Sequence, residues 1–267
     1  MKRGGYKPGT HMKFAQVNGQ RQEAQPNLSG ECPGCGRLVV PKCGEVRIRH
    51  WAHKGPRLCD SWWENETQWH RAWKDQFSTD WQEIVHAAGD GERHIADVKT
   101  GDGWVIEFQH SHIKPEERRS REAFYPKLIW VVDGTRRKRD RAQFASAWQE
   151  GRPVGGNSLV RRTFSSDCGL LREWAGSNAP IFFDFGDIDN LWWLFAKGPN
   201  GSAYIQQFPR AIFIACHRET GKGIAQQFNA LVNDIPKLIA AYESHREAPQ
   251  VRWDPLQPRR PYRRIRF

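Results

Sequence analysis

The sequence is short of acidic residues and lacks long apolar runs, and each shortage excludes a class of protein. Against 41 lysines and arginines it has only 30 aspartates and glutamates, which gives a formal net charge of +11 and makes a polyanion the expected partner. No apolar run approaches the roughly 20 residues that cross a bilayer, and the polar N-terminus does not resemble a secretion signal. We therefore expect a cytoplasmic protein with no membrane partner.

Apolar residues are also scarce, but the ones present are large. Only 38% of the 267 residues are hydrophobic, yet 13 tryptophans and 14 phenylalanines supply bulky side chains for a core. Residues 1–11 show no periodicity and read as a disordered or added extension outside the fold. The rest divides by texture into an N-terminal module, a central core, an aromatic-rich α+β region and a basic tail, at 12–61, 62–150, 151–247 and 248–267.

The pattern of the central core is helix, three strands, helix, strand, which predicts an α/β fold. Aromatic residues recur on one face over 62–77, as in an amphipathic helix. Strand-like segments follow near 82–87, 93–99 and 103–109. Pro115 opens a charged helix that ends near Tyr125, and 128–132 is the continuous apolar run expected of a strand buried on both faces.

The flanking regions have weaker patterns. Residues 13–25 predict a hairpin, because Asn18-Gly19 near their centre favours a type I′ turn. The aromatic-rich region predicts strands at 181–185 and 191–195 and a helix over 223–242, with a bend at Pro236. The pattern leaves open whether this region extends the central sheet or folds separately.

Four of the six cysteines lie close together in the N-terminal module. Cys32-Pro33-Gly34-Cys35 is a knuckle in which two thiolates can bind one tetrahedral ion. The further donors downstream are Cys43, His50, His53 and Cys59. These six donors are more than the four that a tetrahedral zinc ion needs, so we predict a closed structural zinc site in a reducing compartment. The alternative is a pair of buried or redox-active thiols.

Two acidic residues lie in adjacent strand-like segments of the central core. Asp97 belongs to one segment, Glu107 and Gln109 to the next, and a Thr-Gly-Asp-Gly turn separates them. Because side chains on a strand alternate, a hairpin brings all three together. Converging carboxylates repel unless a cation is present, and hard oxygen ligands suit Mg²⁺ or Mn²⁺. The pattern predicts a metal-dependent phosphodiesterase centre; a solvated hairpin is the alternative.

Other polar residues follow a helical row or form basic runs. Glu66, His70 and Lys74 are spaced at four-residue intervals along the first predicted helix. Arg136-Arg137-Lys138-Arg139 would make a good phosphate contact, and the tail 248–267 adds further arginines.

In this order, the motifs resemble the competence protein CoiA-like family, a branch of the PD-(D/E)xK nuclease superfamily. The matching residues are Cys32, Cys35, His50, Trp51, His53 and Cys59, then Glu66, His70 and Lys74, then Asp97, Glu107, Gln109, Ser111 and Ile113, and finally Arg121 and Tyr125 before the strand at 129–131. They cover roughly residues 13–134. The resemblance implies an αβββαβ restriction-endonuclease-like core behind the zinc module.

The resemblance also implies roles for these residues. Asp97 and Glu107 would hold one or two Mg²⁺ or Mn²⁺ ions, with Glu66 as a further ligand and His70 positioning it or a phosphate. Gln109 stands where the superfamily usually has lysine, so nearby cations must stabilise more of the transition-state charge. The candidates for this role or for DNA contact are Lys74, Arg118, Arg121 and Tyr125. The favoured zinc ligands are Cys32, Cys35, His53 and Cys59, with His50 as the rival of His53 and Cys43 as an extra thiol.

Three functions follow as hypotheses. The first is a metal-dependent nuclease that cleaves single- or double-stranded DNA. The second is a non-cleaving DNA-binding subunit on the same scaffold, acting in DNA uptake, recombination or defence. The third is a zinc-ribbon interaction protein whose aromatic-rich region binds a protein partner. DNA against RNA and homo-oligomer against monomer are left open.

Overall fold

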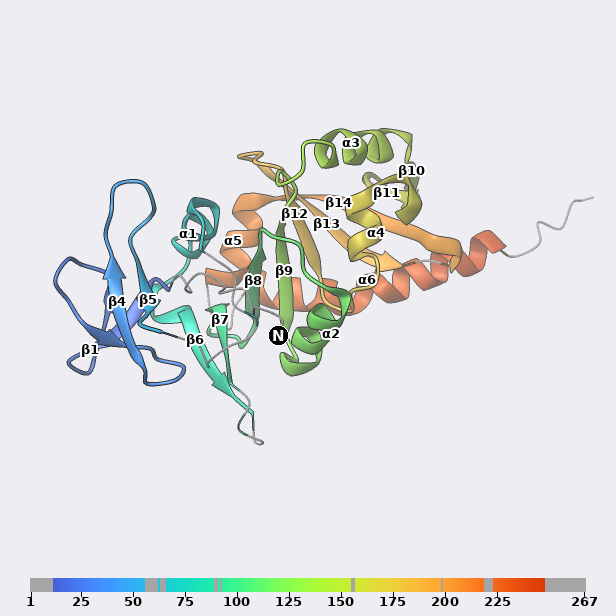
Figure 1. Ribbon diagram of the computed structural model, residues 1–267. Helices are drawn as coiled ribbons and strands as arrows, with labels where there is room; N and C mark the ends of the chain where they lie inside the picture. Colours follow the sequence, from blue (N-terminus) through green and yellow to red (C-terminus); the bar gives the residue numbers. More distant parts are fainter. Residues whose placement is uncertain are drawn as a thin grey trace, which may run out of the picture.

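The computed structural model describes residues 12–55, 62, 66–88, 91, 93–154, 157–197, 199–218 and 223–247, and over these ranges the protein is a mixed α/β structure with two sheets and six α-helices (Figure 1). Two segments marked out in the sequence, 1–11 and 248–267, lie outside the described residues. Each helix of the described ranges falls short, in length or in apolar content, of what a bilayer crossing requires.

The smaller sheet forms the N-terminal module. Its strands are β1 (Phe14–Val17), β2 (Gln20–Glu23), β3 (Gly30–Glu31), β4 (Leu38–Lys42) and β5 (His50–His53), in the order β2-β1-β3-β4-β5. The predicted hairpin is present: Val17 pairs with Gln20 across a turn in which Asn18 and Gly19 both have positive φ, as a type I′ turn requires. Trp51 of β5 belongs to the small core of this module.

The larger sheet combines strands from the central core and the aromatic-rich region. Its strands are β6 (Gln82–Ala87), β7 (Arg93–Lys99), β8 (Val105–Gln109), β9 (Leu128–Asp133), β10 (Arg152–Val154), β11 (Asn157–Phe164), β12 (Ile181–Asp184), β13 (Asn190–Lys197) and β14 (Ser202–Pro209), in the order β10-β11-β14-β13-β12-β9-β8-β7-β6. Strands β8, β9 and β12 run parallel to one another. The region after residue 150 therefore extends the central sheet, which the sequence pattern left open.

Helices cover both faces of the larger sheet (Figure 1). They are α1 (Gln68–Lys74), α2 (Pro115–Phe124), α3 (Asp140–Glu150), α4 (Gly169–Trp174), α5 (Arg210–Arg218) and α6 (Ile224–Glu247). Along β9, Ile129 and Val131 pack with aromatic residues of α1, α5 and α6, while Trp130 and Val132 pack with those of α3 and α4. This alternation, with burial on both sides, explains the continuous apolar run in the sequence.

Several predicted boundaries differ from the structure. The first helix begins at Gln68, because Thr67 caps it: the Thr67 hydroxyl accepts from the backbone N–H of His70, and the His70 ring accepts from the backbone N–H of Thr67. Glu66 therefore precedes the helix and is not part of a helical row with His70 and Lys74. Strand β8 begins two residues later than predicted, and α6 continues through Pro236 to Glu247.

Candidate active site and metal centre

Three of the predicted zinc ligands meet at one end of the smaller sheet. Ligand atoms of Cys32, Cys35 and His53 all lie within 4.8 Å of one another, and His53 Nε2 is 3.4 Å from Cys35 Sγ. The knuckle closes through the backbone N–H of Gly36, which donates to the Cys32 carbonyl at 2.8 Å, with Gly36 at φ +70°. The group can hold a metal ion, and two thiolates with an imidazole are donors that zinc prefers.

The other candidate ligands separate clearly from this group. His50 and His53 lie three residues apart on β5, so their side chains point to opposite faces of the strand. His50 Nδ1 lies 2.8 Å from the Ile48 carbonyl, and burial lowers the pKa of His50. Cys43 is half-buried outside the three-residue group, and Cys59 lies outside the described residues. Among the described candidates, the geometry therefore favours His53 over its rival.

Asp97 and Glu107 approach each other where the ladder between β7 and β8 ends. The last pair on this side is Val98 with Ile106. Beyond it, the backbone N–H of Phe108 donates to Asp97 Oδ2 at 2.9 Å, and that of Asp97 donates to Glu107 Oε1 at 3.4 Å. Each carboxylate thus accepts a backbone N–H that a carbonyl would accept in a regular ladder. These hydrogen bonds fix both side chains at the point where β7 and β8 cease to pair.

These two carboxylates line a small cavity with other predicted site residues. The cavity has a volume of about 20 Å³, enough for a water molecule or a small ion. Its lining residues are Trp62, Glu66, His70, Lys74, Ile95, Asp97, Glu107, Phe108 and Arg121. Asp97 is the more open of the two carboxylates, with 20% of its side chain exposed, whereas Glu107 is 5% exposed. Asp97 and Glu107 therefore line the same cavity.

Lys74 lies at the centre of the acidic residues. Its Nζ is 3.4 Å from Glu66 Oε1, 3.0 Å from Glu83 Oε1 and 3.2 Å from Asp97 Oδ1. Burial by itself lowers the pKa of Lys74, but these three carboxylates outweigh it and raise the pKa. The ammonium group therefore remains charged although its side chain is only 1% exposed.

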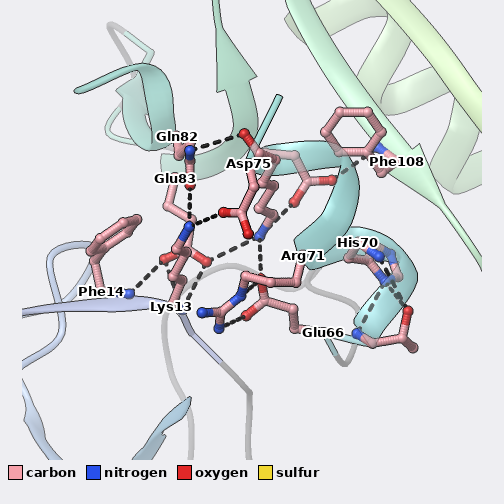
Figure 2. A network of polar contacts seen from close by, with 12 residues as sticks. Lys13, Phe14, Glu66, His70, Arg71, Asp75, Gln82, Glu83 and Phe108 are labelled. Atoms are coloured by element: carbon pink, nitrogen blue, oxygen red, sulfur yellow. Dashed lines mark hydrogen bonds and ion pairs between the residues drawn. The ribbon is translucent and has the colours of Figure 1, made fainter. Parts of the chain in front are cut away.

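Glu66 and Glu83 are fixed by further partners (Figure 2). Burial raises the pKa of Glu66, but Lys74 and a two-point contact from Arg71, at 3.0 and 2.9 Å, outweigh it and lower the pKa. Glu83 was not predicted from the sequence. Its carboxylate accepts the backbone N–H groups of Lys13 and Phe14 at 2.9 to 3.1 Å, while burial raises its pKa. The only sequence signal for Glu83 was an acidic residue near the start of a predicted strand.

The remaining predicted residues are buried around the cavity or behind it. Arg121 donates to Glu107 Oε2 at 2.8 Å and to Glu117 at 2.6 Å, and Gln109 donates to the Ser111 carbonyl at 3.1 Å. The four residues proposed for DNA contact, Lys74, Arg118, Arg121 and Tyr125, are all buried. These four side chains are therefore not exposed for the DNA contact that the sequence predicted.

Comparison with known proteins gives no indication of the chemistry of this site. No family model, no curated protein and no solved structure matches this chain. What the geometry establishes is a small polar cavity in which Glu66, Asp97 and Glu107 face Lys74 and Arg121. Such a cavity can bind a divalent cation in place of part of its internal charge pairing, or it can persist as a buried ion-pair network.

Proposed function

We propose that this protein is a divalent-metal-dependent nuclease that hydrolyses phosphodiester bonds in DNA. The observation that carries the proposal is the convergence of Asp97 and Glu107, from the two strands of an opened ladder, on one cavity with Glu66 and Lys74. The element order from α1 to β9 and the order of the motifs support a PD-(D/E)xK core of the CoiA-like kind. The net charge of +11 supports an anionic polymer as substrate.

The residues around the cavity fit a hard cation. Carboxylate oxygens are the ligands that Mg²⁺ and Mn²⁺ prefer, and Asp97 and Glu107 would hold the ion with Glu66 as a further ligand. When bound, such an ion polarises a phosphoryl oxygen and lowers the pKa of an attacking water. Lys74 contributes a fixed positive charge beside Asp97, which compensates for the neutral Gln109. Arg121 orients Glu107 through its 2.8 Å contact.

For the Cys32, Cys35 and His53 group, we propose a structural zinc ion. The sulfur-rich donor set fits zinc far better than magnesium. Cys59 is the proposed fourth ligand. This site would stabilise the N-terminal module and take no part in the hydrolysis.

One specific observation favours the second hypothesis, a DNA-binding subunit that does not cleave. Glu107 is already paired with Arg121, and Asp97 with Lys74. These pairs neutralise the carboxylates without any metal ion. A protein that kept the scaffold for DNA handling would retain the same network.

A cleavage assay separates the two functions. The full-length protein is incubated with end-labelled single- and double-stranded DNA and RNA in Mg²⁺, in Mn²⁺ or in EDTA. We expect metal-dependent cleavage of DNA that falls by about 100-fold or more in Asp97→Asn and Glu107→Gln. Glu116→Gln, at a residue 73% exposed on α2, is the control with the same change of charge. Cleavage that survives both cavity substitutions would reject the site, and metal-independent binding without cleavage would support the second function.

A further inference from the structure

A chain of contacts leads from the cavity to the carboxyl ends of the parallel strands. His70 lines the cavity, and its ring centre lies 5.9 Å from that of His110, the residue after β8. His110 Nδ1 is 2.7 Å from Asp133 Oδ2 at the end of β9. Asp133 Oδ1 in turn accepts the backbone N–H of Thr135 at 2.8 Å and its hydroxyl at 2.6 Å. The cavity is therefore connected, side chain by side chain, to the loop that follows β9.

That loop and the first two residues of α3 carry the densest run of positive charge among the described residues. Residues 136–141 contain five basic residues and one acidic residue, and none is apolar. The acidic one, Asp140, accepts from Arg137 Nε at 2.7 Å. Lys138 and Arg139 are exposed, and neither pairs with an acidic group within the ranges that the structure describes.

Glu173 of α4 fixes one side of this loop. Its carboxylate accepts two contacts from Arg136 Nη2, at 2.6 and 2.7 Å, and one from Arg137 Nη2 at 3.0 Å. It also lies 3.0 Å from the Nδ1 of the exposed His112. Burial raises the pKa of Glu173, but Arg136, His112 and Arg137 together outweigh burial and lower it. One carboxylate thus orders three cationic or protonatable groups and leaves Lys138 and Arg139 to solvent.

We propose that His110, His112 and Arg136 to Arg139, here called the basic edge, bind the phosphate backbone of DNA on its path to and from the cavity. This inference rests on the proposed function, because that function places the bond to be hydrolysed at the cavity. The carboxyl edge of parallel strands is where open α/β sheets bind their ligands. A protein partner would need an apolar or aromatic anchor, which residues 136–141 lack, whereas phosphates need only cations.

The test compares the DNA affinity of wild type with that of a variant in which two charges of the basic edge are reversed. Wild type and the Lys138→Glu/Arg139→Glu variant are titrated in EDTA with fluorescent duplex and single-stranded DNA over about 0.05 to 0.2 M salt, the range in which released counterions dominate. The matched control is Lys127→Glu/Lys237→Glu. It has the same change of charge, with Lys127 at the opposite end of β9 and Lys237 73% exposed on α6. All four substituted side chains are exposed, so unchanged melting curves confirm that each variant is folded.

We expect the basic-edge variant to bind duplex DNA about tenfold more weakly and the slope of log affinity against log salt to fall by about 2, since each lost phosphate contact removes about 0.9. The control should change neither quantity comparably. Equal effects in the two variants would overturn the basic edge as a DNA site even if the protein cleaves DNA. Weakened binding in a protein that cleaves nothing would support the basic edge and reject only the nuclease. Polyglutamate that competes as well as DNA, charge for charge, would also overturn the proposal.

Discussion

Lys74 shows how a single buried charge can define a site. Its ammonium group contacts carboxylates from three separate segments, at Glu66, Glu83 and Asp97. Removing such a charge from water costs several kcal/mol, and the attraction of its partners must offset that cost. Exchanging Lys74 alone for an apolar residue would remove the ammonium group that all three carboxylates contact, and a buried charge that loses its partner is strongly destabilising. Lys74 lies beside Asp97, whose side chain is 20% exposed, and this position fits the role proposed for its charge.

At the same scale, His217 makes the stability depend on pH. Burial lowers the pKa of His217 to about 4, and its side chain lies between Phe213 and Phe228. The unfolded chain binds a proton near pH 6.5, so stability is full above that pH and is lost as the pH falls toward 4. We expect this residue to account for about 3 kcal/mol of the loss.

Urea unfolding of wild type and His217→Phe between about pH 7.5 and 4 measures this term. The variant should lose less stability over that range, while His245→Phe, at an exposed histidine of α6, should behave as wild type. Parallel pH profiles for wild type and His217→Phe would show that His217 does not contribute.

At the scale of elements, α1 depends on a strand from the other half of the chain. Seven residues are too few for a helix that is stable by itself. Trp69 and Trp73 both donate their indole N–H to Asp184 Oδ2, at 3.0 and 2.8 Å, and Arg210 pairs with the same carboxylate. Asp184 at the end of β12 therefore holds the helix that carries His70 and Lys74.

We expect Asp184→Asn to weaken this anchor, because a neutral amide accepts hydrogen bonds less strongly than a carboxylate and leaves Arg210 without its charge partner. The stability loss should be about 1 to 3 kcal/mol. Hydrogen exchange should speed up in α1 more than in β9, and proposed cleavage should fall with it. Asp187→Asn in the next loop is the control. Exchange that rises equally throughout the sheet would indicate general destabilisation and no specific anchor.

At the scale of the whole molecule, the small core of the N-terminal module and the two cores of the larger sheet are joined by polar contacts. Within the described ranges, the module core has only seven buried residues, of which Trp51 is the one aromatic residue, whereas the larger sheet is packed on both faces. The junction includes Glu83, which accepts from the backbone of Lys13 and Phe14, and Gln82, which accepts from Lys13 Nζ at 2.9 Å. A module of this size is expected to need its metal ion.

Elemental analysis should therefore find about one zinc ion per chain, and a strong chelator should remove it. Hydrogen exchange should then speed up by about tenfold or more over β1 to β5 and stay nearly unchanged over β8, β9 and β12. Cys35→Ser should reproduce the effect without chelator. Zinc-free protein with full protection in the module would contradict a structural metal site.

The sequence by itself determined the features that depend on neighbouring residues. The Asn18-Gly19 hairpin, the cysteine knuckle and the helix from Pro115 follow from local backbone preferences. Asp97 and Glu107 meet because a short turn forces adjacent strands together. The order of elements from α1 to β9 could be predicted because the spacing of apolar residues in each segment distinguishes a helix from a strand.

Only the tertiary structure decided which distant residues share the cavity and which surface is free. Glu83 reaches the backbone of Lys13, and Asp184 reaches α1, because strands and helices far apart in the sequence pack together. The same packing buries Arg118 and Arg121, which a sequence shows merely as charges, and leaves Lys138 and Arg139 exposed. Local preferences cannot fix such contacts, because their energies depend on burial and on partners that come together only when the chain folds.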